Sequence, residues 1–402
     1  MLEKRVNRFI KLFPWFQGLI GDLLFYIAID TLFLTVVKNF SAAQIVSLTS
    51  LSQVVCIALQ LPLLFVIKKI GNTNSSIMRG FCILISSVLI TFGKNFYFVL
   101  LGRIFHDIAA IFGSATIVAL ENNLDLVGRR HDFVRVRTIA NTVYSVITML
   151  ISFVASLMFN LNNYLPMIAC IATCSIGFIL SFFMKDYSKY NRISAKTEKG
   201  EKVKISYSKF IILAIVVYAI YYPVVVTGQS EGKLFIQQQL LLEFNVDKTA
   251  LILGAVICVS RIIRVFSNLL FVKLYYKYKE RVGVALPILL CSAIGFILFG
   301  SFIPSIIVKI ALMSMGYVVI LFARDPFRLY VQDVIFENTP KEQHQTLITL
   351  LEFGVKIGTA GMGLSFAAIL TQYSMLVVMA ILFVISLIEI CLSIRLYKAI
   401  RN

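Results

Sequence analysis

Residues 102–113 read GRIFHDIAAIFG, a stretch that places a guanidinium, an imidazole and a carboxylate among apolar side chains. Apolar segments flank it on both sides, FYFVLL (96–101) before it and SATIVAL (114–120) after it. The combined run can cross a hydrocarbon layer about 30 Å thick, for which about 20 helical residues suffice. Charged side chains at that depth are costly and usually face the interior of a helix bundle. The stretch therefore predicts a membrane-spanning helix that turns its polar residues toward other helices.

The composition of the whole chain agrees with this interpretation. Of 402 residues, 59% are hydrophobic and 14% are charged, and the mean hydropathy is +0.88. Soluble domains average about 25% charged residues, so this composition is typical of an integral membrane protein. Apolar runs of about 20 residues recur along the chain. We predict twelve spans, at residues 14–37, 42–67, 76–93, 96–120, 138–160, 163–184, 209–232, 248–272, 282–302, 305–325, 346–371 and 373–396.

The net charge of +18 follows a topological pattern and does not indicate nucleic-acid binding. Basic residues gather at alternate loops and at both ends of the sequence, as they do on the cytoplasmic side of membrane proteins. We therefore expect a multi-pass protein of the cytoplasmic (plasma) membrane, with both termini cytoplasmic and anionic lipid headgroups beside its basic loops. The basic clusters are Lys4, Arg5, Arg8 and Lys11; Lys68, Lys69 and Arg79; Arg129, Arg130, Arg135 and Arg137; Lys273, Lys277, Lys279 and Arg281; and Arg395, Lys398 and Arg401.

Other features of the sequence exclude several classes of protein. The seven cysteines all fall within predicted spans and lack the spacing of a disulfide framework or a metal site, so we expect no metal and no cofactor. Asp22 and Asp30 interrupt the first apolar run, which therefore does not resemble a cleaved signal peptide. The chain has no HExxH motif, no GxxxxGK[ST] loop and no nucleophile–base constellation, so we predict that it is not an enzyme.

The chain divides around its longest polar segment, KDYSKYNRISAKTEKGEKVKISYSK (185–209), which is rich in charge and has no apolar periodicity. Such a composition is typical of a flexible linker. We predict an N-terminal bundle of six helices at 1–184, a basic cytoplasmic linker at 185–208, and a C-terminal bundle of six helices at 209–402.

The two halves also resemble each other in layout. KNFSAAQIVSL (38–48) enters the second span of the first half, and LEFNVDKTALI (242–252) enters the matching span of the second half. Ser41 with Gln44 predicts a capping box, and Asn245 predicts an N-cap, each just after an apolar run that ends in Phe. Repeated halves around a midplane cavity are a recurrent design of transporters. The sequence thus predicts an all-α integral membrane protein of two pseudo-symmetric six-helix bundles.

The fourth span carries the first of two motifs that resemble a known family. LLGRIFHDIAA (100–110) is similar to the fourth-helix pattern of the major facilitator superfamily, in which an Arg is followed by Gln-Gly and small residues. Arg103 matches this Arg, whereas His106 and Asp107 stand where Gln and Gly are usual. The Gly-Pro antiporter signature of the family's fifth helix is absent from NTVYSVITMLISFVAS (141–156). The resemblance therefore indicates the superfamily without assigning a subfamily.

The second motif lies in the loop between the second and third spans. LFVIKKIGNT (64–73) occupies the place where the family has Gly, then Asp-Arg-x-Gly and basic residues. Lys69 and Gly71 match this pattern, but Leu64 and Lys68 replace the first Gly and the Asp. The resemblance, which covers essentially the full length, implies a twelve-helix transporter with alternating access and a gating role for Lys69 and Gly71. We expect it to act as a monomer.

Acidic residues of the first span and polar residues of the fourth define a predicted proton-coupling group. Counting 1.5 Å per residue from the outer helix ends puts Asp30 and Arg103 at matched depths of roughly 10 Å. The family resemblance makes these helices neighbours, so we predict an Asp30–Arg103 ion pair, with Asp107 as an alternative or third partner. Asp22 shares a broad helix face with Asp30 and can receive a proton from the cytoplasmic side. Two interpretations stay open, a static buried pair and a proton switch.

Further polar residues predict a substrate cavity and moving helix contacts. His106 is interpreted as a hydrogen-bonded cavity residue, and Arg261 either meets an anionic group of the substrate or snorkels toward the membrane surface. The seventh span is expected to bend or break toward its outer end, at Pro223, Gly228 and Gly232. Arg324, Asp325 and Arg328 are expected to form an ion-pair cluster at the inner end of the tenth span. The predicted cavity residues are His106, Tyr218, Tyr221, Tyr222, Gln229 and Arg261; the predicted gating or bundle-interface residues are Lys69, Gly71, Pro223, Gly354, Gly358 and Gly361.

These features predict a secondary active transporter that moves a small organic solute and is coupled to protons. Tyrosine-rich cavity walls suit a neutral or weakly charged solute that contains a ring. One alternative is an efflux pump for drugs or amphipathic compounds. An alternative of another class is a membrane sensor or scaffold that keeps the fold but transports nothing.

Overall fold

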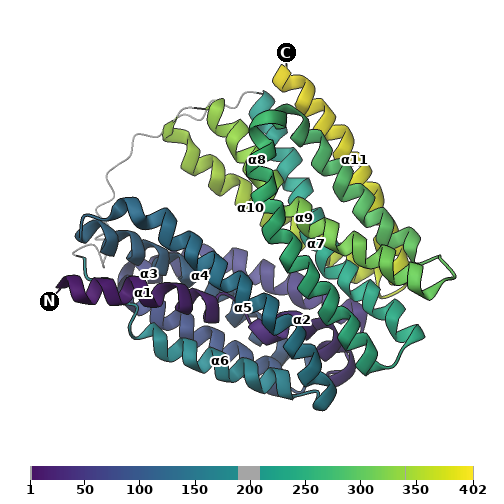
Figure 1. Ribbon diagram of the computed structural model, residues 1–402, viewed down its shortest axis with the longest axis horizontal. Coiled ribbons are helices and arrows are strands. Elements are labelled where there is room, and N and C mark those ends of the chain that lie inside the picture. The colour runs from purple at the N-terminus through teal and green to yellow at the C-terminus, as the bar shows by residue number, and fades with distance from the viewer. Residues whose placement is uncertain (1, 189–208, 340, 402) are drawn as a thin grey trace. The chain divides into compact units, whose positions relative to one another are not determined.

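The computed structural model describes residues 2–188, 209–339 and 341–401, and these residues form helices and connecting loops without a strand (Figure 1). The predicted linker, 185–208, lies outside the described residues from residue 189 onward. The helices are α1 Leu2–Ile20, α2 Leu24–Leu32, the π-helix Phe33–Val37, α3 Ala42–Phe92, α4 Phe96–Leu126, the 3-10 helix Arg130–Asp132, α5 Phe133–Leu161, α6 Leu165–Ser181, α7 Lys209–Glu243, α8 Val246–Gly300, α9 Ile306–Glu337, α10 Lys341–Ile369 and α11 Met375–Arg401.

The all-α prediction is confirmed, but the helices do not correspond one to one with the predicted spans. Eight helical segments of the described residues are long and apolar enough to cross a membrane, and α6 is a shorter apolar helix. Two predicted pairs of spans share one label each, α3 and α8, and non-helical backbone interrupts each of these helices, at Gly71 and Tyr278 respectively. The first predicted span is instead split into α1 and α2. The described part of the chain therefore contains eleven α-helices.

Predicted caps at helix starts are confirmed. The Ser41 backbone N–H donates to Gln44 Oε1 at 2.9 Å, and the Gln44 N–H donates to Ser41 Oγ at 3.3 Å, which is a capping box at the start of α3. Asn245 Oδ1 accepts from the Lys248 N–H at 3.0 Å at the start of α8. Local sequence therefore determines these two helix starts.

Lys38 caps the C-terminal end of α3. Its ammonium donates to the carbonyl oxygens of Thr91 at 2.6 Å and Gly93 at 2.9 Å, where α3 ends, and lies 5.2 Å from the centre of the Phe33 ring. Partial burial lowers the pKa of this ammonium from its usual value. The contact ties the end of the π-helix to the end of α3.

Two compact units can be described separately. The first contains Met1–Phe40 and Leu51–Lys199, and the second contains Ser41–Ser50 and Gly200–Asn402. Within the second unit α10 packs closely on α7, because Gly358 leaves room for Pro223: a Cβ at residue 358 would lie 2.7 Å from the proline Cγ. A Cβ at Gly354 would lie 3.2 Å from the Ala219 Cβ of the same helix α7. The glycines at 354 and 358 thus serve close packing inside this unit.

The interruption of α3 depends on Gly71, which has φ 84° and ψ 166°. A side chain is strongly disfavoured in that region of backbone space, so glycine supplies the only ready solution. Asn72, the next residue, is buried and donates through its side chain to Asp186 Oδ2 at 2.8 Å. The interruption at Gly71, which lies in the predicted loop between the second and third spans, is therefore built into the packing of the first unit, and Lys69 beside it is exposed.

Replacing Gly71 with Ala is expected to lower the free energy of unfolding by about 1–3 kcal/mol, the usual cost of forcing a side chain into this backbone conformation. Gly361→Ala is the matched control, because a Cβ at residue 361 meets no atom within 4 Å. Thermal unfolding of the two purified variants in the same detergent measures the difference. Equal stability of both variants would mean that the interruption of α3 tolerates a side chain.

Candidate functional site

The first helix is broken where the predicted proton-coupling residues begin. α1 ends at Ile20 and α2 starts at Leu24, so Gly21, Asp22 and Leu23 lie between two helix ends. Gly21 has little room around it, because a Cβ there would lie 2.6 Å from the Gln17 carbonyl oxygen. Backbone groups freed by such a break need partners at membrane depth, where water is scarce. The break therefore creates polar groups that the rest of the unit must satisfy.

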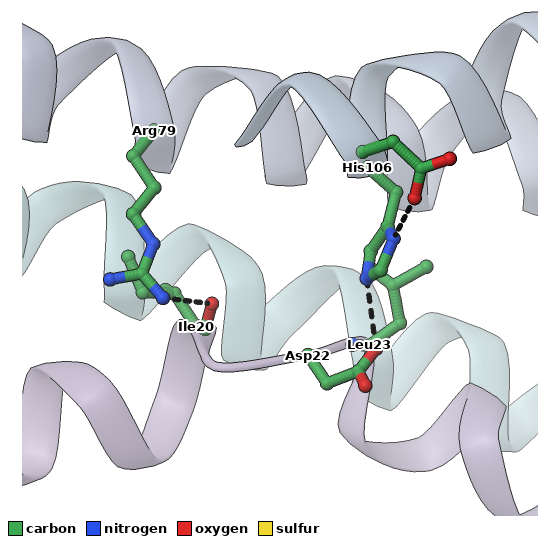
Figure 2. Close-up of polar contacts among 6 residues, drawn as sticks. Ile20, Asp22, Leu23, Arg79 and His106 are labelled. Carbon is green, nitrogen blue, oxygen red and sulfur yellow. Dashed lines mark hydrogen bonds and ion pairs between the residues drawn. The ribbon is translucent and has the colours of Figure 1, made fainter. Parts of the chain in front are cut away.

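Asp22, inside this break, meets His106 of α4 (Figure 2). His106 Nε2 lies 2.9 Å from Asp22 Oδ1, which also accepts from the Leu23 backbone N–H at 2.8 Å. The other ring nitrogen of His106, Nδ1, lies 3.3 Å from Asp107 Oδ1. The histidine side chain is 13% exposed, against 32% for Asp22 and 17% for Asp107. The imidazole thus joins carboxylates from two segments that are far apart in the sequence.

This arrangement depends on the protonation of the imidazole. A neutral imidazole has a single N–H, whereas the imidazolium has two. Only the imidazolium can therefore donate to both Asp22 and Asp107 at once. Gain or loss of one proton changes which of the two carboxylates is held, and this is the chemistry that a proton-coupled helix contact needs.

Arg103 lies one turn before His106 on α4 and belongs to the same polar cluster. Its Nε is buried without a hydrogen-bond partner, and its charge interacts with those of Asp107, Asp22 and Asp30. Asp30 Oδ1 accepts from the Thr31 backbone N–H at 2.6 Å. His106 and Asp22 make a direct contact between α4 and the break of the first helix. The Asp30–Arg103 ion pair stays a prediction.

The open end of α1 is closed by Arg79, which comes from α3 (Figure 2). Arg79 Nη2 donates to the Ile20 carbonyl oxygen at 3.4 Å, Nη1 donates to Gln17 Oε1 at 3.0 Å, and the guanidinium lies 5.7 Å from the centre of the Phe16 ring. A cation at the last turn of a helix satisfies free carbonyls and complements the helix dipole. Arg79 is only 7% exposed.

The surroundings of two charged residues were not predicted. Arg79, which we grouped with the basic loop residues, is instead buried in the first unit, where it caps the end of α1. In the second unit, Arg324 Nε donates to Tyr222 Oη at 3.2 Å and Nη1 donates to Gln229 Oε1 at 2.8 Å, while the predicted cluster of Arg324, Asp325 and Arg328 stays a prediction. The side chain of Asp325 lies outside the described residues, and Arg328 pairs with Glu352 at 3.1 Å.

Arg324, Tyr222 and Gln229 form a polar group that joins α9 to α7, here called the Arg324 group. The guanidinium lies 5.7 Å from the centre of the Tyr222 ring, and the rings of Tyr218 and Tyr222 are 5.5 Å apart. Tyr222 and Gln229 are partly exposed, whereas Tyr218 is almost fully buried. The group offers an aromatic face beside hydrogen-bonding groups, and the sequence had predicted its two α7 members but not the arginine.

Two other predicted site residues of the second unit, Tyr221 and Pro223, contribute to the packing of α7 against neighbouring helices. Tyr221 is fully buried, donates to the Ala323 carbonyl oxygen at 3.1 Å and stacks on Phe327, with ring centres 3.8 Å apart. α7 continues through Pro223, so the predicted break is not observed, and Pro223 packs against α10 instead. Arg261 has a buried Nε without a hydrogen-bond partner, and its predicted contact with substrate stays a prediction.

Sequence reasoning also missed a buried acid on α11. Glu389 is 0% exposed, its Oε1 accepts from Ser393 Oγ at 3.2 Å, and its Oε2 has no hydrogen-bond partner. A single acidic residue within the apolar segment LFVISLIEICLS (382–393) is the signal that would have identified it. Among the residues that the structure describes, no three His, Cys, Asp or Glu side chains gather as a metal ion would require.

Comparison with known proteins identifies the family. Residues 16–335 match the Major Facilitator Superfamily, and the chain belongs to this family. A search among curated proteins gives no match.

Solved transporters share the fold at low sequence identity. The crystal structure of the nucleoside transporter NupG (D323A mutant) is similar with a TM-score of 0.77 and 12% identity, over 98% of this chain and 100% of that one. A bacterial homologue of the iron transporter ferroportin, in its inward-facing state, is similar with a TM-score of 0.70 and 11% identity, over 97% and 99% of the two chains. The family and these relatives are transporters, so the chain is a multi-pass membrane protein of a transporter family and not an enzyme.

Proposed function

We propose that the protein is a secondary active transporter that moves a small organic solute across the cytoplasmic membrane by alternating access. Membership of the Major Facilitator Superfamily supports this proposal. Twelve spans in two six-helix bundles follow if α1 with α2 counts as one span and α3 and α8, interrupted at Gly71 and Tyr278, count as two each. The basic loops orient both termini toward the cytoplasm.

The proposed coupling ion is the proton, and the observation that carries this proposal is the contact of His106 with Asp22 and Asp107. A proton that reaches the cluster changes the hydrogen bonds between α4 and the break of the first helix. Broken helices at ion and substrate sites are frequent in secondary transporters, because such a break can reorganise at little cost. Arg103 supplies a further positive charge, which interacts with Asp22 and Asp107 and also with Asp30.

The proposed solute is neutral or weakly charged and contains a ring. This proposal is supported by the Arg324 group, where a tyrosine face lies beside a guanidinium and an amide. Aromatic rings bind flat ring systems, and the polar groups fix their orientation. Nucleosides have this chemistry and are carried by one structural relative, so they come first in a test panel. Export of amphipathic compounds is the alternative that the same group would serve.

Transport is tested with purified protein in proteoliposomes, where labelled nucleosides and other ring-containing solutes are offered with and without an imposed pH gradient. Accumulation above equilibrium that requires the gradient is the expected result. Comparison of small molecules inside and outside cells that carry or lack the protein extends the panel to unforeseen solutes. Binding of a solute without any flux, in either direction, would favour the sensor or scaffold alternative.

Tyr222→Phe is expected to weaken solute binding about tenfold or more, because one hydrogen bond to a charged group contributes about 1.5–3 kcal/mol. The change removes the hydroxyl that accepts from Arg324 but keeps the aromatic face. Tyr373→Phe is the matched control, since Tyr373 is 59% exposed in the turn before α11. The measurement is the half-saturating concentration of the solute in proteoliposomes. Equal values for both variants would remove Tyr222 from the substrate site.

A further inference from the structure

A groove between α8 and α11 has no role in the proposed transport cycle. The two helices pack against each other within the second unit, and the groove between them has a volume of about 440 Å³. Its lining residues are Arg281, Val284, Ala285 and Ile288 from α8 and Ile394, Tyr397 and Lys398 from α11. None of these residues belongs to the polar cluster of the first unit or to the Arg324 group.

The chemistry of the groove changes along the helix axes. Arg281 directly follows the polar stretch KYKE (277–280), and Lys398 lies in the basic stretch RLYKAIR (395–401), so the two cations of the groove lie at the ends of their apolar segments. Ile288 lies seven residues, or roughly 10 Å, further along α8, and Ile394 lies one turn before Lys398 on α11. Ile288 is 46% exposed and Ile394 is 36% exposed. The groove is therefore cationic at the membrane surface and apolar at the depth of the acyl chains.

The cations of the groove are available to a ligand. Arg281 and Lys398 are both exposed, and neither forms an ion pair within the described parts of the chain. Tyr397 also lines the groove, one residue before Lys398, and tyrosine favours the headgroup level of a bilayer, where its ring is buried and its hydroxyl is wet. Arg binds phosphate oxygens through two parallel N–H groups, and Lys adds a second positive charge.

We infer that this groove binds one anionic phospholipid, with the phosphate between Arg281 and Lys398 and an acyl chain along Ile288 and Ile394. A free phosphate ion would use the two cations but gain nothing from the apolar floor. A zwitterionic lipid would fill the apolar floor but carries its own positive charge at the headgroup. An anionic lipid alone matches both parts of the groove. Binding of the lipid does not depend on the proposed transport of a solute.

The experiment measures lipid binding to the purified full-length chain in detergent by native mass spectrometry, with dioleoylphosphatidylglycerol, dioleoylphosphatidylcholine and inorganic phosphate as probes. One equivalent of phosphatidylglycerol is expected to bind more tightly than phosphatidylcholine, and millimolar phosphate should not displace it. Each cation near the membrane surface contributes roughly a fivefold gain in affinity. Arg281→Gln/Lys398→Gln should therefore weaken phosphatidylglycerol binding about 25-fold. Ile288→Gln should weaken it as well, since the acyl chain loses an apolar contact.

The matched control is Arg395→Gln/Lys94→Gln, which removes the same charge from two exposed positions outside the groove. This control should bind phosphatidylglycerol as the unchanged protein does. Equal losses in the two double variants would mean general attraction to basic surface and would overturn the site. Displacement by inorganic phosphate, with no effect of Ile288→Gln, would assign the groove to a free anion and overturn the lipid. Size-exclusion profiles verify that each variant is folded.

Discussion

His106→Ala is expected to lower the free energy of unfolding by about 3 kcal/mol and to abolish accumulation driven by a pH gradient. Removing one partner of a buried ionic contact costs about 3–5 kcal/mol, because the other partner stays without compensation. The lower end of this energy range applies to His106→Ala, since the Asp22 side chain is 32% exposed and keeps part of its hydration. Chemical denaturation in detergent and uptake in proteoliposomes measure the two effects.

The conservative variant His106→Gln separates stability from coupling. Glutamine keeps a donor and an acceptor but cannot gain a proton, so this variant should fold and exchange solute without a response to pH. His131→Gln is the matched control, because the His131 side chain is 76% exposed and lies outside the cluster. Uphill, pH-driven accumulation by His106→Gln would place the coupling elsewhere, and the predicted Asp30–Arg103 pair would then be the first candidate. In that case Asp30→Asn/Arg103→Gln should lose the response that His106→Gln retains.

Arg79→Ala is expected to lower the free energy of unfolding by about 2 kcal/mol and to loosen the break between α1 and α2. The variant leaves the Ile20 carbonyl and the Gln17 amide without their charged donor, and each hydrogen bond to a charged group contributes about 1.5–3 kcal/mol. Release of the buried guanidinium from its desolvation offsets part of that loss. Thermal unfolding measures the stability, and hydrogen exchange of the Asp22, Leu23 and Leu24 amides measures the order of the break.

Two further variants distinguish a cap from ordinary packing. Arg79→Lys keeps the positive charge but lacks the planar guanidinium that donates to two acceptors at once. It should therefore lose protection from hydrogen exchange at these amides, and it should lose less stability than Arg79→Ala. Lys69→Ala, on the same helix but exposed, should change the stability by less than about 0.5 kcal/mol. Unchanged hydrogen exchange in Arg79→Ala would show that the helix end is satisfied without Arg79.

Sequence alone was sufficient for the apolar helices, for two helix caps and for the family. Apolar runs predict helices that cross a membrane because the bilayer demands a certain length and satisfied backbone groups. The caps at Ser41 and Asn245 were predictable because their hydrogen bonds span only three residues. The glycine turn at Gly71 was predictable as a feature of the loop, since the required backbone conformation belongs to one residue. The family could be identified from the fourth helix and this loop.

Positions around the helix axis were not predictable, and they decide the candidate site. Counting residues gives depth along an axis, so it placed Asp30 and Arg103 at one level but could not determine which side chain faces which. The relation assumed between Asp22 and Asp30 required one continuous helix, whereas the break after Ile20 resets the rotation of everything that follows. Asp22 consequently meets His106, and no spacing in the sequence connects these two residues.

Only the tertiary structure could reveal that Arg79 closes the broken helix, that Arg324 joins Tyr222 and Gln229, and that Glu389 is buried. Partners from another helix explain the two arginines, whereas the hydrogen bond of Glu389 comes from Ser393 of its own helix. The sequence by itself therefore determined that this chain is an all-α membrane protein of the transporter kind, because membrane solvation acts on every segment separately. The tertiary structure decided which polar groups meet, because that depends on how the helices are broken, rotated and packed against one another.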